Sequence, residues 1–136
     1  MTACGRSKEK EPLPAWRLYR SSRIRYLKRV ADTVGVDYAI LSAEYGLVPS
    51  DEVIAPYERV MDEKRCHEIL PVLVESLKRM RVRAIVFYRG GARKEYYECL
   101  RRAAESVGAD LISVGYANMG DIGKVKGILE GLVKKV

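Results

Sequence analysis

Asp37-Tyr38-Ala39-Ile40-Leu41, followed at once by Ser42-Ala43-Glu44-Tyr45-Gly46-Leu47-Val48-Pro49, is the stretch that decides the fold. Its first part is a short apolar run, which is typical of a buried parallel strand. Its second part turns polar, keeps one glycine and stops at a proline. Because ligands bind at the carboxyl ends of the strands in open α/β sheets, this segment predicts a binding site at a sheet edge.

Outward from this stretch, strand patterns alternate with helix patterns. We predict strands at 36–42, 83–88 and 109–115, and residues 1–4 as the stub of a first strand. We predict helices at 22–34, 62–80, 92–107 and from 120 to the end, the first one capped by Ser22 and terminated by Gly35. The apolar spacing predicts that the inward faces are formed by Ile24, Leu27, Ala31 and Val34 in the first of these helices and by Tyr96, Cys99, Leu100 and Ala103 in the third. The alternation predicts one domain over residues 1–136, a three-layer α/β/α fold with a mostly parallel, Rossmann-like sheet.

The composition is that of an ordinary globular domain. The chain has 136 residues, 48% of them hydrophobic and 32% charged. No apolar stretch approaches the roughly 18 to 20 residues that a membrane helix needs, and the amino terminus lacks the apolar segment of a signal peptide. We therefore expect no membrane association and a cytoplasmic location.

The net charge of +7 is distributed unevenly. Residues 1–34 carry a net charge of +6, residues 35–75 carry −6, and residues 76–136 carry +7. Basic clusters of this kind favour binding to a polyanion, because each neutralised phosphate releases counterions. The alternative is that these Lys and Arg side chains only solvate helix faces. We expect a nucleic acid or a nucleotide as the partner.

The three cysteines are odd in number and far apart, so they predict neither a disulfide framework nor a zinc cluster. Cys66 and Cys99 fall on the apolar faces of predicted helices, where we expect them in the core. His67 has no partner at a metal-ligand spacing and is expected at the surface. We expect neither a metal nor a cofactor.

Cys4 differs from the other two cysteines in its surroundings. It ends the predicted first strand and precedes Arg6 and Lys8, an electropositive setting that favours a nucleophilic thiolate. The alternative is a small buried hydrophobic residue, the commoner fate of a free cysteine. If the sheet is parallel, Cys4 lies at the same edge as the ends of the other strands.

Several residues of the opening stretch are candidates for that same edge. Glu44 has the chemistry of a general base or of a hydrogen-bond partner for a base or ribose, and Tyr45 can stack on a planar ring. Gly46 permits a turn or a close approach to a ligand. The alternative is a tight turn whose Leu47 and Val48 dock into the core. The remaining candidates of this region are Ser42, Asp51 and Tyr57.

Two further segments carry candidate ligand contacts. Gly90 and Gly91, between a strand and a helix, can expose backbone amides to an anion, although a plain turn is the alternative. Trp16 can stack on a nucleobase between two arginines, or it can hold its loop against the sheet.

The motifs quoted so far resemble those of a widespread family of small uncharacterised α/β proteins, a domain of unknown function. The residues that carry this resemblance span nearly the whole chain: Cys4-x3-Lys8, Leu18-Tyr19-x-Ser21-Ser22, Ile40-Leu41-Ser42-Ala43-x-Tyr45-Gly46-Leu47-Val48, Pro56-Tyr57 and Gly90-Gly91. The resemblance implies an α/β fold and leaves the activity open.

A remoter resemblance is to the core catalytic module of archaeosine synthase, which acts on a 7-deazaguanine nitrile in tRNA. Cys4 and Lys8 keep that module's spacing, and Tyr19 and Ser22 match its next motif. Arg25 stands in place of its histidine, and ten residues separate Lys8 from Tyr19. This resemblance implies substrate-binding roles for Tyr19 and Ser22 and a cysteine nucleophile.

These observations lead to one functional hypothesis and two alternatives. We predict a nucleobase- or nucleotide-processing enzyme linked to nucleic-acid modification. In it Cys4 is the nucleophile, Lys8 favours the thiolate or holds an anion, and Glu44 or Asp51 moves protons. The first alternative is a non-catalytic nucleic-acid- or nucleotide-binding module that uses the basic surfaces. The second is a nucleotide-sensing or scaffold subunit.

Overall fold

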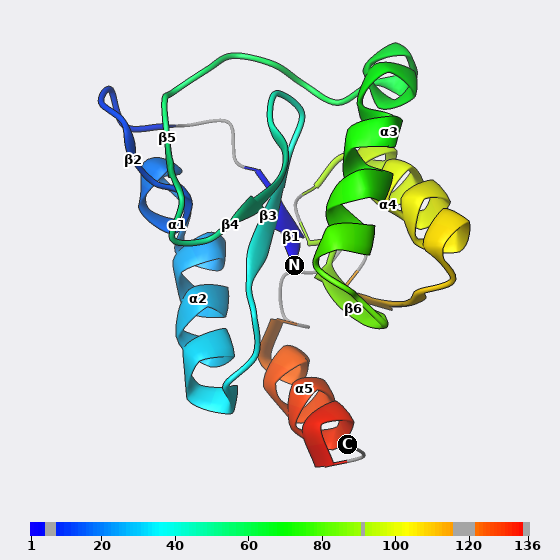
Figure 1. Ribbon diagram of the computed structural model, residues 1–136. Coiled ribbons are helices and arrows are strands. Elements are labelled where there is room, and N and C mark those ends of the chain that lie inside the picture. Colours follow the sequence, from blue (N-terminus) through cyan, green and yellow to red (C-terminus); the bar gives the residue numbers. More distant parts are fainter. Residues whose placement is uncertain (5–7, 91, 116–121, 135–136) are drawn as a thin grey trace.

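A five-stranded sheet lies at the centre of the computed structural model, which describes residues 1–4, 8–90, 92–115 and 122–134 (Figure 1). Its strand order is β4-β3-β1-β6-β7. Four strands are parallel and β4 is antiparallel to β3. The predicted α/β class with a mostly parallel sheet is therefore confirmed. The strands are β1 (Thr2–Ala3), β3 (Ala39–Ser42), β4 (Gly46–Pro49), β6 (Ala84–Tyr88) and β7 (Asp110–Val114).

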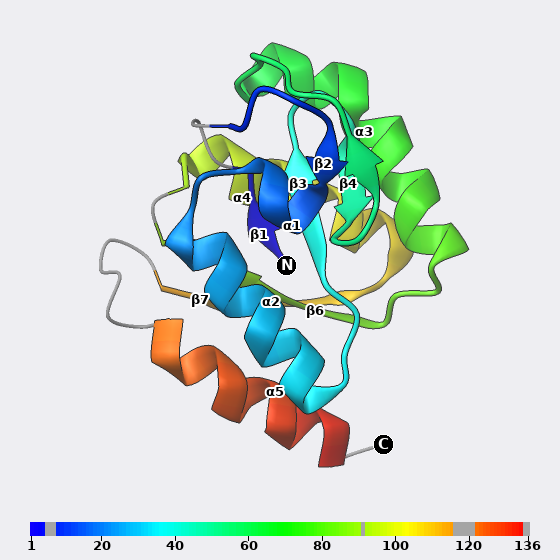
Figure 2. The same ribbon diagram turned by 90° about the vertical axis from the view of Figure 1, so that its left-hand side faces the viewer.

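The longer helices cover the two faces of this sheet. Helices α3 (Glu63–Arg79) and α4 (Lys94–Val107) pack together on one face, and α2 (Ser22–Val34) and α5 (Lys124–Lys134) lie on the other (Figures 1 and 2). Side chains of the strands alternate between these faces, as a period of two requires. Leu41 and Phe87 point to the α3–α4 face, whereas Ile40 and Val86 point to the α2–α5 face.

The helix boundaries follow the sequence signals closely, with one correction at α2. Gly35 ends α2 in the left-handed conformation with φ +84°, as predicted. The N-cap, however, is Ser21 and not Ser22, because the Ser21 hydroxyl accepts a hydrogen bond from the Ile24 amide at 3.3 Å. Ser22 is the first helical residue and is exposed.

Short strands occupy segments that the sequence pattern assigned to loops. Residues 46–49 form β4, and β5 (Val53–Ile54) pairs with β2 (Leu13–Pro14) in a separate two-stranded sheet. Helix α1 (Ala15–Leu18) follows β2 directly. Elements of two to four residues have no periodicity of their own, so only the tertiary pairing reveals them. The predicted strand over 36–42 is limited to 39–42.

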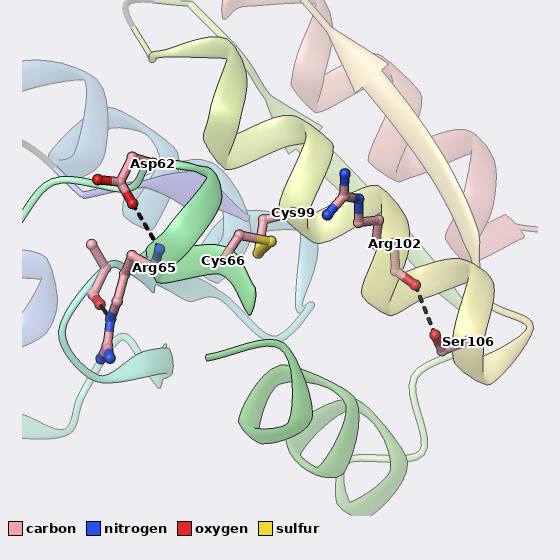
Figure 3. Close-up of a disulfide and its surroundings, with 7 residues drawn as sticks. Asp62, Arg65, Cys66, Cys99, Arg102 and Ser106 are labelled. Atoms are coloured by element: carbon pink, nitrogen blue, oxygen red, sulfur yellow. Dashed lines mark hydrogen bonds between the residues drawn. A yellow bond between two sulfur atoms is a disulfide. The ribbon is translucent and has the colours of Figure 1, made fainter. Parts of the chain in front are cut away.

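A disulfide joins the two helices of one face, which the sequence analysis did not predict. Cys66 of α3 and Cys99 of α4 are bonded, with their Cα atoms 5.7 Å apart (Figure 3). Their expected burial is confirmed, at 4% and 0% exposure. The packing of α3 against α4 brings together two cysteines that are 33 positions apart in the chain. Cys4 remains the free cysteine.

Within the described residues, no helix has the length and apolar character needed to cross a membrane.

Candidate active site at the carboxyl edge of the sheet

The parallel strands reverse their order between β1 and β6, and Cys4 lies at this point. From β1 the chain proceeds to the neighbouring β3 on one side, while the later strands β6 and β7 are added on the other side. In doubly wound sheets such a switch point is where ligands bind. Cys4 directly follows β1, and its amide donates a 2.9 Å hydrogen bond to the Leu41 carbonyl of β3. Ser42 and Arg89 mark the ends of the flanking strands.

The Cys4 thiol is half-buried and contacts a phenol of helix α4. Its Sγ lies 3.3 Å from the hydroxyl of Tyr96 in the first turn of α4. The same hydroxyl oxygen accepts a hydrogen bond from the Met61 amide at 3.3 Å. Burial raises the pKa of Tyr96, so the phenol keeps its proton near neutral pH. In the contact between this hydroxyl and the sulfur, either the phenol or the thiol can be the donor.

A chain of hydrogen-bonded hydroxyl groups, those of Ser42, Tyr57 and Tyr19, begins at the end of β3. The Ser42 hydroxyl accepts from the amides of Glu44 and Tyr45, both at 3.1 Å, and donates to the Tyr57 hydroxyl at 2.7 Å. The Tyr57 hydroxyl is in turn 2.6 Å from that of Tyr19. Burial is the main cause that raises the pKa of Tyr57 and of Tyr19, and the nearby Cys4 is the second. Both phenols are therefore proton donors at neutral pH.

Lys8 joins this group of tyrosines. Its backbone forms an antiparallel bridge with Tyr19. Its ammonium nitrogen lies 4.5 Å from the ring centre of Tyr57 and 5.7 Å from that of Tyr19. A cation over an aromatic face is attracted by the ring quadrupole. The structure thus brings Lys8, Tyr19, Ser42 and Tyr57 together beside Cys4.

The Ala43–Tyr45 turn is a β-hairpin held by α3. Gly46 pairs with Ser42 and has φ +82°, a conformation that favours glycine, and a Cβ there would meet Val72 at 3.3 Å. The Arg65 guanidinium donates to the carbonyls of Ala43 and Glu44 at 2.6 and 2.9 Å (Figure 3 shows Arg65 beside the turn). Leu47 and Val48 are buried. Gly46 serves the hairpin and its contact with α3.

The side chains of Glu44 and Tyr45 lie at the outer rim of this turn. The Glu44 carboxylate is 3.6 Å from Arg59, a partly exposed ion pair. Tyr45 is 38% exposed, donates to the Ala55 carbonyl at 2.9 Å and packs edge-to-face on Tyr57 with ring centres 5.2 Å apart. Through Tyr57, the Tyr45 ring is connected to the hydroxyl chain.

Gly90 is linked to the end of β1 by hydrogen bonds from Arg23. A Cβ on Gly90 would overlap the hydroxyl of Tyr88, so glycine is required there. The Gly90 carbonyl accepts a 2.8 Å hydrogen bond from Arg23, which also donates to the Ala3 carbonyl at 3.0 Å. Gly90 therefore lies at the switch point. Gly91 is outside the described residues, as are Gly5, Arg6 and Ser7.

Three predicted site residues lie elsewhere. Because β4 runs antiparallel, Asp51 follows its far end, where Ser50 bonds to Tyr38, and it pairs with Lys28 at 3.5 Å. Trp16 and Ser22 line a separate surface groove along α1 and α2, together with Ser21, Arg25, Lys28, Arg29 and Asp32. The structure does not bring Asp51, Trp16 or Ser22 to Cys4.

An apolar groove of about 450 Å³ opens at the opposite, amino edge of the sheet. It runs between α2 and α5, and its walls are largely aliphatic, with Leu27, Val82 and Leu129 among them. None of the groups around Cys4 except Tyr88 lines it. The polar groups and this groove are therefore at different ends of the strands.

Sequence reasoning missed Arg23, Arg65 and Tyr96 as parts of the site. Arg23 precedes Leu27 by four residues, so both lie on the buried face of α2. Because arginine is rarely buried, its place in this pattern was a signal of a special role. Tyr96 was assigned to the core, where a phenol hydroxyl needs a partner. No pattern in the sequence predicts that Arg65 donates hydrogen bonds to the hairpin turn.

No three His, Cys, Asp or Glu side chains of the described residues are grouped so that they could hold a metal ion.

The comparison with protein families shows the family of this chain. A family of unknown function (DUF6884) matches residues 1–124. The chain belongs to this family. No curated protein and no solved structure matches the chain. The matched residues include the sheet, the hydroxyl chain and Cys4, and the family has no assigned activity.

Proposed function

We propose that this member of DUF6884 is an enzyme that processes a nucleobase or nucleotide in nucleic-acid modification, with Cys4 as its nucleophile. The observation that carries the proposal is the position of Cys4. It is the free thiol, it follows β1 at the switch point, and it contacts the Tyr96 hydroxyl at 3.3 Å. We also infer that the domain is of the three-layer Rossmann-like class, for which this edge is the ligand-binding edge.

The neighbours of Cys4 supply what an addition to an unsaturated carbon needs. As the sulfur bonds to the carbon of a C=N or C≡N group, one π bond opens and the nitrogen takes a proton. Tyr96 donates that proton, and the thiol proton replaces it on the phenol. The exposed ring of Tyr45, beside the half-buried ring of Tyr57, offers an edge and a face against which a planar base can pack.

The resemblance to archaeosine synthase supports a nitrile as the group attacked. Addition of the Cys4 thiol to a nitrile gives a thioimidate, R–C(=NH)–S–Cys4, without loss of any atom. An amine can then attack that carbon and release the thiol, which leaves an amidine. Glu44, at the rim of the site with its carboxylate near Arg59, is the carboxylate available for the second proton transfer.

The test is covalent capture of the thiol, followed by intact-mass spectrometry under non-reducing conditions. Because Cys66 and Cys99 form a disulfide, a single iodoacetamide adduct is expected, on Cys4. With 7-cyano-7-deazaguanine as the probe, the mass is expected to rise by the whole mass of the nitrile. Cys4→Ser is the matched control and removes both adducts. A Cys4 that reacts with neither reagent overturns the proposal.

A non-catalytic nucleic-acid-binding module is the second candidate, and the groove of about 550 Å³ along α1 and α2 favours it. Trp16, Arg25 and Arg29 line this groove, which combines an aromatic ring with cations as single-strand binding surfaces do. A module predicts an affinity for single-stranded RNA that falls steeply with salt and is unchanged by Cys4→Ser. The double variant Arg25→Gln/Arg29→Gln is expected to weaken it. RNA binding that is insensitive to salt contradicts this candidate.

A further inference from the structure

Arg23 is a buried cation at the switch point. It is the second residue of α2 and is 8% exposed. One terminal nitrogen donates to the Gly90 carbonyl after β6, and the other donates to the Ala3 carbonyl of β1 at 3.0 Å. That carbonyl belongs to the peptide bond that joins Ala3 to Cys4. The guanidinium therefore lies next to the proposed nucleophile and spans the two strands between which the sheet order reverses.

The charge of Arg23 has no acidic partner among the described residues. Its Nε atom is buried and has no hydrogen-bond partner. The ionisable groups that act on it are the phenols of Tyr38, Tyr88 and Tyr96 and the thiol of Cys4, and none of them is a carboxylate. Burial lowers the pKa of the Arg23 guanidinium below its usual value, but arginine stays charged in proteins. A buried charge without a counter-charge is costly.

The start of α2 adds to this positive potential. The helix has thirteen residues, and its first turn contains no acidic side chain. The partial positive charge of a helix amino terminus is therefore not compensated there. Lys8 adds a cation over the Tyr57 ring. The predicted carboxylate Glu44 pairs with Arg59.

We propose that Arg23 makes the carboxyl end of β1, beside Cys4, a binding site for an anionic group of the substrate, a phosphate or a carboxylate. The anion supplies the counter-charge that the described residues do not give Arg23. This inference names the substrate class of the site proposed above and rests on that proposal for its functional meaning. It favours a substrate with a negative charge close to the carbon that Cys4 attacks, such as a nucleotide, over a neutral free base.

A purely structural role of Arg23 makes a different prediction. In that role the guanidinium only ties the Ala3 and Gly90 carbonyls together, and its charge has no effect on small anions. A measurement that reports the potential at Cys4, and not only the stability of the fold, separates the two roles.

The first measurement is the ratio of two alkylation rates at Cys4, one with anionic iodoacetate and one with neutral iodoacetamide. Both reagents attack the same sulfur, so the thiolate fraction cancels in the ratio. Arg23→Met is expected to lower the ratio by about ten-fold, since one nearby charge is removed. Arg23→Lys keeps the positive charge, so we expect this variant to keep most of the wild-type ratio. Arg79→Met, which removes an exposed arginine at the carboxyl end of α3, is the control and is expected to leave the ratio unchanged.

The second measurement does not depend on the reactivity of Cys4. Inorganic phosphate, compared with sodium chloride at the same ionic strength, is expected to raise the melting temperature of the wild-type protein by about 2–5 °C at ten times its dissociation constant. Acetate serves as the carboxylate probe, and whichever anion gives the larger shift identifies the group. Arg23→Lys is expected to keep at least half of the shift.

The outcomes are distinguishable from those of the proposed function. If Cys4 is inert but phosphate or acetate stabilises the protein through Arg23, the anion site stands and the nucleophile proposal fails. If neither anion raises the melting temperature of the wild-type protein, the anion site is overturned. An unchanged alkylation ratio in a folded Arg23→Met variant overturns it as well.

Discussion

The α3–α4 interface and the carboxyl edge of the sheet use the same residue type in opposite ways. At the interface, Cys66 and Cys99 are buried in a disulfide among apolar side chains such as Leu73 and Leu100 (Figure 3). At the edge, Cys4 is a half-buried free thiol next to a phenol and close to a buried guanidinium. The interface contains what stabilises a fold. The edge contains polar groups that stability alone does not require.

The difference also appears in how polar atoms are satisfied. The hydroxyl groups of Ser42, Tyr57 and Tyr19 have hydrogen-bond partners, whereas the buried Nε of Arg23, at the end of β1, has none among the described residues. Buried polar groups are normally paired, and an exception points to a functional role or an absent ligand. The carboxyl edge is therefore the part of the molecule in which a function is expected. Three predictions test the difference between this edge and the α3–α4 interface.

The largest effect is expected from the disulfide. Replacing both cysteines, as Cys66→Ala/Cys99→Ala, opens a loop between residues that are 33 positions apart, and loop-closure entropy predicts a loss of roughly 4 kcal/mol in the free energy of unfolding. Urea unfolding followed by circular dichroism measures it, with and without dithiothreitol. Cys4→Ala is the control and is expected to cost less than about 1 kcal/mol. If the two variants lose equal stability, the contrast between interface and edge is wrong.

A smaller loss is expected at the start of the hydroxyl chain. Ser42 is fully buried and its hydroxyl makes three hydrogen bonds. Ser42→Ala leaves two amides and a phenol without this partner, at a cost of about 1–3 kcal/mol. Ser106→Ala is the matched control, because Ser106 is exposed and makes one bond, to the Arg102 carbonyl (Figure 3). Urea unfolding of both variants compares them, and equal losses would show that the buried chain contributes no special stability.

The smallest effect is a dependence of stability on pH. Burial raises the pKa of Tyr19, Tyr57 and Tyr96 in the folded protein above the ordinary value of 10. The unfolded chain then loses these protons first, so their stabilising contribution is complete below pH 10 and is lost as the pH rises above it. The slope is at most about 1.4 kcal/mol per pH unit for each tyrosine.

Urea unfolding between pH 8 and 11 measures this slope, and Tyr57→Phe is expected to make it less steep. Tyr26→Phe is the comparison, because Tyr26 is a half-buried tyrosine of α2 that is not part of the hydroxyl chain of Ser42, Tyr57 and Tyr19. An identical slope for the wild-type protein and Tyr57→Phe would mean that the phenols of the edge are solvated in the folded state.

The ends and inward faces of the helices were predictable because they depend on local signals. Gly35 ended α2 as expected, since only the left-handed conformation completes that turn without strain. Ile24, Leu27 and Ala31 on α2, and Cys99, Leu100 and Ala103 on α4, are buried as their spacing indicated. The placement of Cys4 and Ser42 at one edge followed from the parallel strands alone.

The site itself was predictable only in part. Asp51 was expected beside Cys4, but antiparallel pairing of β4 carries it to the other end of β3. A four-residue edge strand has no periodicity that would distinguish it from a loop. Arg23 and Tyr96 were assigned to helices without a role, because their partners come from segments that the sequence does not place next to them.

By itself, the sequence determined the alternation of strands and helices, the faces that become buried and the edge at which polar groups gather. These features depend on residue spacing within single elements. Only the tertiary structure decided the disulfide, the direction of β4 and the contact of Cys4 with Tyr96, which are 92 residues apart. Such contacts depend on the order in which strands pair and helices pack, and that order places a buried arginine, whose Nε has no hydrogen-bond partner among the described residues, near Cys4.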